Sequence, residues 1–123
     1  MQHSDATLKE FREEADELLT SMEDALLAAQ ENGGVDREDL DAIFRAAHTI
    51  KGGAGLLGFA NIVSFTHVAE NVLDDAREGK LALTPELIDL FLTVKDHMHA
   101  LVEIAVRDSS DAKIPDTLLA KGD

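Results

Sequence analysis

The chain has 123 residues, enough for one compact domain with a single hydrophobic core. Apolar residues make up 45% of the sequence but aromatic residues only 4%, so the core must be built mainly from aliphatic side chains and phenylalanine. The net charge is −14, from 11 basic and 25 acidic residues, which disfavours nucleic acid and anionic lipid and favours positively charged protein surfaces as partners. The chain contains no cysteine, which excludes disulfides, thiolate metal sites and a cysteine nucleophile.

The N-terminal part of the chain is acidic and amphipathic, unlike the basic and then uniformly apolar start of a signal peptide. No apolar run approaches the length needed to cross a membrane. We therefore expect a soluble, cytoplasmic protein that does not insert into a membrane.

Apolar residues recur at spacings of three and four residues rather than alternating, which predicts α-helices. The first predicted helix spans residues 5–32 and ends at Gly33 and Gly34, in the manner of a C-terminal glycine cap. A second begins near Asp36 and is broken by Gly58.

A third helix is predicted over residues 60–78, before Gly79, and a fourth opens at Thr84 and Pro85. Threonine is a favourable capping residue and proline suits the first helical position. The apolar stripe of the third helix consists of Ile62, Phe65, Ala69, Val72, Leu73 and Ala76. Because the connections are short, the expected fold is an all-α, antiparallel up-down four-helix bundle.

The stretch FRAAHTIKGGAG, residues 44–55, places three glycines within the second predicted helix. Each glycine costs about 0.5–1 kcal/mol relative to alanine, so their presence needs a reason. The residues beside the apolar stripe on this helix are Phe44, His48, Lys51, Gly52 and Gly55. Gly52 and Gly55 leave a smooth surface by which loops of another protein could approach the imidazole. We therefore expect Phe44, Gly52 and Gly55 to belong to a partner-docking surface.

His67, Glu70, Asn71 and Asp74 share one face of the third predicted helix. If that face meets the second helix, Glu70 can accept a hydrogen bond from one ring nitrogen of His48 and leave the other nitrogen free as a nucleophile. Lys51, one turn along, could balance a phosphoryl charge. Plainer interpretations stand beside this one: the glycines could serve helix packing alone, and a histidine–glutamate pair is often a simple surface ion pair.

Four segments of the chain resemble, in the same order, the N-terminal phosphoacceptor (P1) domain of CheA-type chemotaxis histidine kinases, which belongs to the histidine phosphotransfer (HPt) class. The segments are FREEADELL (residues 11–19), IFRAAHTIKGGAGLLG (43–58), THVAENVLDDA (66–76) and LIDLFLTVKD (87–96). The resemblance covers about residues 5–106, and its most specific part runs from His48 to Gly55.

This resemblance implies two-component phosphotransfer: His48 would be phosphorylated on its outward nitrogen while Glu70 holds the other nitrogen. His67 and Lys51 are implied as polar neighbours of the site, and Gly52 as the small residue that keeps the approach open. In the family, the phosphoryl donor is ATP bound by a separate kinase domain, in cis or in trans. The acceptors are receiver domains of CheY-type and CheB-type response regulators.

The domain itself is therefore expected to bind no cofactor, since ATP and Mg²⁺ are used by its partner domains. It is implied to be a phosphocarrier without its own ATP site, as part of a histidine protein kinase. Residues 1–108 are expected to form the HPt domain, and residues 109–123 a C-terminal tail. Pro115 interrupts the apolar pattern there, so the tail is expected to be a partial fifth helix or a linker to further kinase domains.

Other classes of function fit the sequence less well than phosphotransfer does. A docking bundle without phosphotransfer would not need the set of His48, Lys51 and Glu70. A di-metal centre in a bundle would use Glu-x-x-His pairs, and no glutamate here has a histidine three residues later. Residues 53–58 fit the glycine spacing of a dinucleotide-binding loop, but a predicted helix rather than a strand precedes them.

Overall fold

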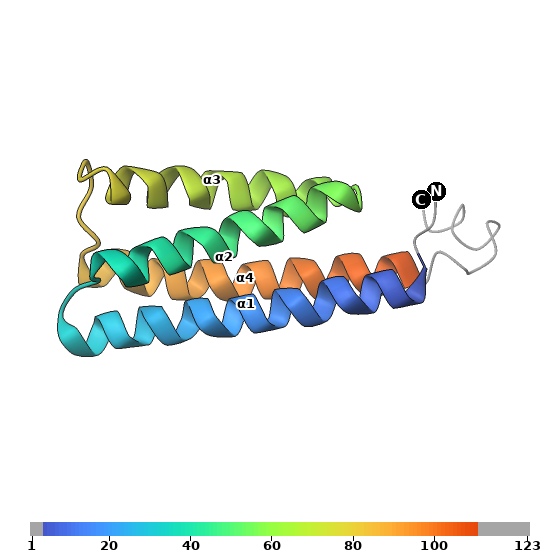
Figure 1. Ribbon diagram of the computed structural model, residues 1–123, viewed down its shortest axis with the longest axis horizontal. Helices are drawn as coiled ribbons and strands as arrows, with labels where there is room; N and C mark the ends of the chain where they lie inside the picture. Colours follow the sequence, from blue (N-terminus) through green and yellow to red (C-terminus); the bar gives the residue numbers. More distant parts are fainter. Residues whose placement is uncertain (1–3, 111–123) are drawn as a thin grey trace.

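The computed structural model describes residues 4–110, which form four α-helices. These are α1 (Asp5–Asn32), α2 (Arg37–Leu56), α3 (Ala60–Arg77) and α4 (Pro85–Ser110). Consecutive helices run antiparallel and lie side by side in an elongated bundle (Figure 1). The all-α, up-down four-helix bundle predicted from the sequence is confirmed.

The helix ends lie close to their predicted positions. Gly33 follows α1 with a φ of 76°, and its N–H donates to the carbonyl oxygen of Ala29, as a left-handed glycine cap does. Thr84 caps α4, since its hydroxyl oxygen accepts a hydrogen bond from the backbone N–H of Leu87 at 3.2 Å. Gly58, with a φ of 77°, lies just beyond the end of α2 and permits the sharp turn into α3.

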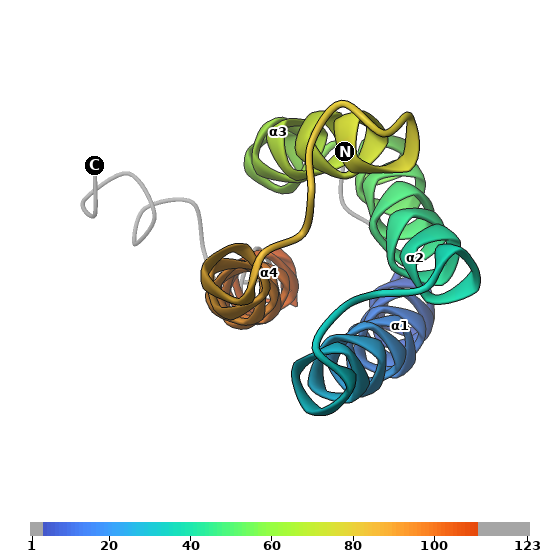
Figure 2. The same ribbon diagram turned by 90° about the vertical axis from the view of Figure 1, so that its left-hand side faces the viewer.

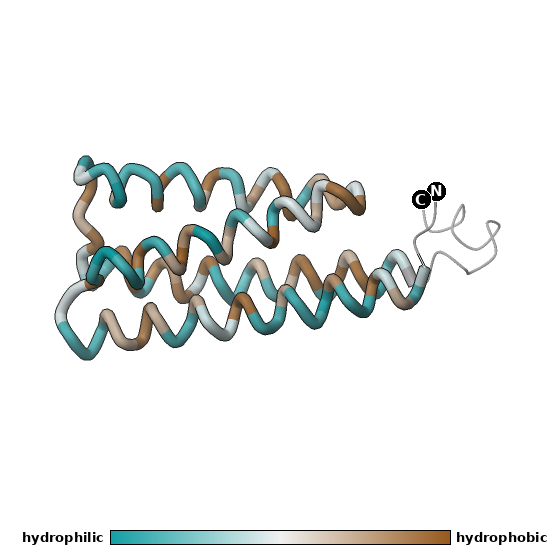
Figure 3. Tube along the Cα trace, viewed as in Figure 1, coloured by the Kyte–Doolittle hydropathy of each residue, from teal (hydrophilic) through white to brown (hydrophobic). Residues whose placement is uncertain are grey.

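Hydrophobic residues recur along each of the four helices (Figure 3). The buried apolar side chains fall into two groups along the bundle. One group, which includes Leu26 and Ile43, lies toward the end that holds the α1–α2 and α3–α4 connections. The other, which includes Leu8 and Met98, lies toward the opposite end. Burial of these aliphatic side chains is the main force that holds the four helices together.

The second helix contacts both α1 and α3 extensively, whereas α3 and α4 contact each other much less than the other neighbouring helices do. Viewed end-on, α1, α2 and α3 follow one another around the bundle and α4 lies between α1 and α3 (Figure 2). The predicted stripe of α2 faces the interior: Ile43, Ala47, Ile50 and Ala54 are each at most 1% exposed. This orientation directs the neighbouring face of α2, which carries His48, toward the α2–α3 edge.

The inward face of α3 differs from the predicted stripe. Thr66 and Glu70 are buried, at 0% and 5% exposure, whereas Phe65, Val72 and Ala76 are only partly buried. The reason is that α3 packs mainly on α2 and only lightly on α4, so the face toward α2 decides which side chains are covered.

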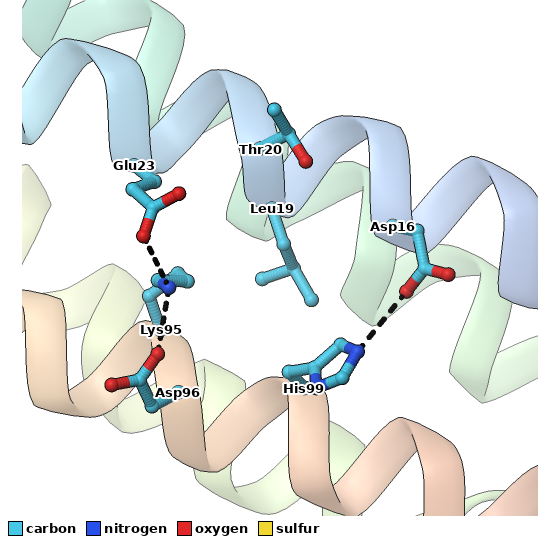
Figure 4. Close-up of a pocket in the computed structure, with 7 residues that line it drawn as sticks. All are labelled: Asp16, Leu19, Thr20, Glu23, Lys95, Asp96 and His99. Carbon is cyan, nitrogen blue, oxygen red and sulfur yellow. Dashed lines mark hydrogen bonds and ion pairs between the residues drawn. The ribbon is translucent and has the colours of Figure 1, made fainter.

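Hydrogen-bonded ion pairs tie α1 to α4 (Figure 4). Lys95 Nζ lies 2.9 Å from Glu23 Oε2 and 2.6 Å from Asp96 Oδ1. The hydrogen bonds to Asp96 and Glu23 raise the pKa of Lys95 above its ordinary value, against the opposing effect of burial. The Lys95–Glu23 pair joins α4 to α1, whereas the Lys95–Asp96 pair lies within α4.

No helix within residues 4–110 is long and apolar enough to cross a membrane. The fourth helix continues to Ser110, so the domain boundary expected after residue 108 falls in its last turn. The predicted partial fifth helix or linker lies in residues 111–123, outside the described part of the chain.

Candidate functional site

His48 projects from the middle of α2 with 64% of its side chain exposed. Its Nδ1 lies 2.6 Å from Oε2 of Glu70, which projects from α3. A carboxylate can only accept a hydrogen bond, so Nδ1 is the nitrogen that carries the hydrogen. In the neutral ring the lone pair then belongs to Nε2, which is the nitrogen available to a phosphorus atom.

Glu70 is a buried carboxylate, with only 6% of its side chain exposed. Its second oxygen, Oε1, lies 2.5 Å from Nζ of Lys51. Burial opposes ionisation, but the hydrogen bonds from Lys51 and His48 outweigh it and hold the pKa of Glu70 below its ordinary value. Glu70 is therefore a charged acceptor at neutral pH.

Lys51 lies one turn after His48 on α2, and 25% of its side chain is exposed. Its ammonium group compensates the buried charge of Glu70. Because Glu70 already has a cationic partner, its charge does not require His48 to be protonated. The site thus combines an imidazole held in one orientation with a balanced ion pair beneath it.

An aromatic side chain and an arginine extend the site toward the N-terminus of α2. The rings of Phe44 and His48 are nearly parallel, at 8°, with their centroids 6.1 Å apart. The guanidinium carbon of Arg77 lies 4.2 Å from the centroid of the Phe44 ring. Arg77 Nε is in turn held by Oδ1 of Asp41 at 2.9 Å. The predicted docking residue Phe44 therefore lies beside both the imidazole of His48 and the guanidinium group of Arg77.

Sequence reasoning missed Arg77 and Asp41. Arg77 lies seven residues after Glu70 and therefore on the same face of α3, which is the signal that could have identified it. Its partner Asp41 lies on α2, and only the packing of α2 against α3 shows that these two residues meet.

The three glycines of α2 have different surroundings. A Cβ atom at Gly53 would lie 3.2 Å from the ring of Phe11, so this glycine serves the packing of α2 against α1. A Cβ atom at Gly52 would meet nothing within 4 Å, and one at Gly55 would make ordinary contact with Val63 at 3.9 Å. Internal packing thus accounts for Gly53 but not for Gly52, which lies on the open surface one turn from His48.

His67 lies on α3, one turn before Glu70, and is exposed. Among residues 4–110 its side chain takes part in no hydrogen bond or ion pair. The structure thus brings His48, Glu70 and Lys51 together and places His67 on the adjoining surface. Its role beside the site stays a prediction.

A second group of ionisable residues lies between α1 and α4. His99 Nε2 is 3.5 Å from Asp16 Oδ1 and 3.9 Å from Glu103 Oε2, and candidate ligand atoms of the three lie within 4.8 Å of one another (Figure 4 shows the first pair). However, Arg12 Nε donates to the same Glu103 oxygen at 2.9 Å. The group is therefore better explained as part of the polar contacts that join α1 to α4.

The Hpt domain family model matches residues 6–104 of the chain. The chemotaxis protein CheA of Salmonella typhimurium is 52% identical over 88 residues, which are 72% of this chain and 13% of that protein. The CheA of Listeria monocytogenes is 38% identical over 92 residues, 75% of this chain and 15% of that protein. The chain therefore spans only a small part of the length of these relatives.

Two solved structures share the fold. The CheA phosphotransferase domain from Thermotoga maritima has a TM-score of 0.76 and 34% identity, over 85% of this chain and 98% of that one. The phosphorylated P1 domain of CheA3 from R. sphaeroides, solved in complex with CheY6, has a TM-score of 0.79 and 25% identity, over 85% of this chain and 81% of that one. The chain belongs to the Hpt domain family, as a phosphotransfer domain of the CheA kind.

Proposed function

We propose that His48 accepts a phosphoryl group from an ATP-dependent kinase domain and passes it to an aspartate of a CheY-type or CheB-type receiver domain. The observation that carries this proposal is the exposed imidazole of His48, whose Nδ1 is held 2.6 Å from the buried carboxylate of Glu70. An exposed nucleophile on a rigid helix, oriented by a charged acceptor beneath it, is what phosphotransfer requires.

In the first step the lone pair of Nε2 attacks the γ-phosphorus of ATP. A P–N bond forms while the bond from phosphorus to the leaving oxygen of ADP breaks. Glu70 holds the Nδ1 hydrogen throughout, which fixes the ring orientation and stabilises positive charge that develops on the imidazole. In the second step a receiver carboxylate attacks phosphorus, and the P–N electron pair returns to Nε2.

ATP and Mg²⁺ are proposed to act in the partner domains and not in this one. The local structure of residues 53–58 supports a domain without its own nucleotide site. These residues form the end of α2 and the turn after it, and not the loop between a strand and a helix that a dinucleotide-binding motif requires. A kinase domain, in the same chain or in another, would hold the nucleotide. A receiver domain would supply the metal ion for the second step. The cytoplasm, where ATP is available, is the compartment in which we propose this domain works.

The test uses labelled ATP and the kinase portion of the CheA from Salmonella typhimurium, a relative of this chain. The wild-type chain and the His48→Gln variant are incubated, then exposed to acid or to base. We expect label that survives base, is lost in acid and is absent from His48→Gln. His97→Gln, an exposed histidine on α4, is the matched control and should label normally.

Labelling of His48→Gln, or acid-stable label on the wild type, would contradict the assignment of His48. Absence of any label with several active CheA kinases would instead favour the alternative, a helical bundle that docks partners without phosphotransfer.

A further inference from the structure

Lys51, expected from the sequence to balance a phosphoryl charge, is engaged elsewhere in the structure. Its Nζ contacts Oε1 of Glu70, and only 25% of its side chain is exposed. Movement of Lys51 toward a phosphoryl group on His48 would leave the buried carboxylate of Glu70 without its cationic partner, which is strongly unfavourable. The phosphoryl group brings about two negative charges to a protein whose net charge is already −14. A second cation beside His48 would therefore stabilise the phosphorylated form.

Arg45 lies one turn before His48 on α2, and its side chain is exposed. Among residues 4–110 this side chain takes part in no hydrogen bond or ion pair. Arg77, the other arginine beside the site, is held by Asp41 and lies over the ring of Phe44. The guanidinium group of Arg45 is therefore available to an anion, whereas that of Arg77 already has partners.

The orientation of the imidazole directs Nε2 toward the side of α2 that carries Arg45. Seen along the axis of α2, at about 100° per residue, Lys51 lies on one side of His48 and Arg45 on the other. The Lys51 side faces α3, because Lys51 and His48 both contact Glu70 there. The two nitrogens of an imidazole point in widely different directions, so Nε2 points away from α3 when Nδ1 is held toward it. A phosphoryl group on Nε2 therefore lies on the side of Arg45.

The spacing of the two residues suits direct contact. Side chains three residues apart on a helix have Cβ atoms about 5–6 Å apart. The Cα–Cβ bond tilts toward the helix N-terminus, so the imidazole of His48 leans toward the turn that holds Arg45. An arginine side chain is long enough to cross this separation, and its planar guanidinium group can donate two parallel N–H bonds to two phosphoryl oxygens. Gly52, on the same side of His48 one turn later, has no side chain to compete for this space.

We propose that Arg45 binds the phosphoryl group on Nε2 of His48 through its guanidinium group and so stabilises the phosphorylated form of the domain. This inference rests on the proposed function, because it assigns a ligand to the product of the first step. The contact forms within this one chain and needs neither the kinase nor the receiver. Two cations then have separate partners: Lys51 pairs with Glu70, and Arg45 pairs with the phosphoryl group.

The first experiment measures the equilibrium between the free and the phosphorylated domain. The wild-type chain and each variant are incubated with ATP, ADP, Mg²⁺ and a catalytic amount of the kinase portion of the Salmonella typhimurium CheA. The phosphorylated fraction is read once it no longer changes. A catalyst alters how fast this point is reached but not where it lies, so contacts with the kinase do not influence the result.

We expect Arg45→Gln to lower the equilibrium constant for phosphorylation about fivefold, since an exposed charge-assisted contact is lost. Arg45→Lys keeps the charge but cannot donate two parallel hydrogen bonds, so its value should fall between those of Arg45→Gln and the wild type. Thermal unfolding of Arg45→Gln should match the wild type, because the exposed side chain holds no other part of residues 4–110 in place.

Arg37→Gln is the matched control for the loss of one positive charge. Arg37 is the first residue of α2, about 16 Å before His48 along the helix axis. Its side chain is also exposed, and it too is without a hydrogen bond or ion pair in the described part of the chain. A charge at that distance is largely screened, so Arg37→Gln should keep the wild-type equilibrium constant.

The second experiment detects the contact by NMR of the purified domain with no partner present. The Nε–H resonance of Arg45 is assigned by its absence from Arg45→Gln. On phosphorylation of the wild-type chain this resonance should move downfield and exchange more slowly with water, as in a charge-assisted hydrogen bond. The corresponding resonance of Arg37 should stay in place.

Three results would overturn the inference: equal equilibrium constants for Arg45→Gln and Arg37→Gln, an Arg45 resonance that does not respond to phosphorylation, or a slower approach of Arg45→Gln to the wild-type equilibrium. The third result would assign Arg45 to the encounter with the kinase. Failure of the proposed function has a different signature, because the wild-type chain would then carry no acid-labile label at all.

Discussion

Glu70 is the residue on which the site depends. Its side chain is buried, and each of its two oxygens contacts a nitrogen atom, Nδ1 of His48 or Nζ of Lys51. Desolvation of a carboxylate is costly, and it is tolerated here because hydrogen bonds and a full positive charge compensate it. Glu70 therefore contributes to stability as well as to the orientation of the imidazole.

The lowered pKa of Glu70 makes that contribution depend on pH. A carboxyl group whose pKa is lower in the native state stabilises the fold above its ordinary value of 4.5, and the stabilisation is lost as pH falls through the native pKa. We expect Glu70→Gln to reduce the free energy of unfolding most at neutral pH, and the difference from the wild type to shrink below about pH 4. Urea unfolding at pH 7 and pH 3.5 measures this.

Asp75→Asn, an exposed carboxylate on the same helix, is the control and should change stability little at either pH. If Glu70→Gln lowers the free energy of unfolding equally at both values of pH, the loss comes from altered packing or hydrogen bonding of the side chain and not from its lost charge.

At the scale of the helices, one side of α2 packs against α1 and another side is open to solvent. Gly53 faces Phe11 of α1 at close range, whereas Gly52 faces open space. The same residue type therefore serves helix packing at one position and partner access at the next.

Alanine substitutions should separate these two tasks. Gly52→Ala should stabilise the domain by about 0.5–1 kcal/mol, because helix propensity improves and no atom is displaced. Gly53→Ala should gain less or lose stability, since its Cβ would lie 3.2 Å from the Phe11 ring, which is buried. Urea unfolding measures both, and an equal or larger gain for Gly53→Ala would show that Phe11 moves aside freely.

Periodicity and caps predicted the helix boundaries well, because glycine at a positive φ and a capping threonine act locally. The same reasoning put Glu70 within reach of His48 on the condition that this face of α3 meets α2, and in the structure it does. It could not tell which of the three glycines packs internally, or that Thr66 is buried in place of Phe65. Those outcomes depend on how closely each pair of helices approaches, which no single helix encodes.

Arg77 is a second case in which the contacts between helices could not be predicted from the sequence. It is the basic residue in the last turn of α3, and nothing in the sequence around it indicates a partner. In the bundle it lies over the ring of Phe44 and pairs with Asp41, so it joins α2 to α3 beside the site. A contact between residues 36 positions apart follows only from tertiary packing.

The whole molecule carries a charge of −14, which acts on every partner that approaches. Attraction to basic surfaces on a kinase or receiver is screened by salt over a Debye length of about 8–10 Å at physiological ionic strength. We expect kcat/KM for transfer to fall several-fold between roughly 50 and 300 mM NaCl, while the rate at saturating receiver changes little. Rapid-quench kinetics at both salt concentrations test this, and an unchanged kcat/KM would show that long-range charge plays no part.

The contact between His48 and Glu70 joins two helices across 22 positions of the chain. In an unfolded chain Glu70 is not held beside His48, so no carboxylate fixes the tautomer of the imidazole. The ability of the domain to carry a phosphoryl group therefore depends on correct folding. A cell that uses such a domain would have a built-in safeguard, because damaged or immature copies would stay silent and would not send false signals.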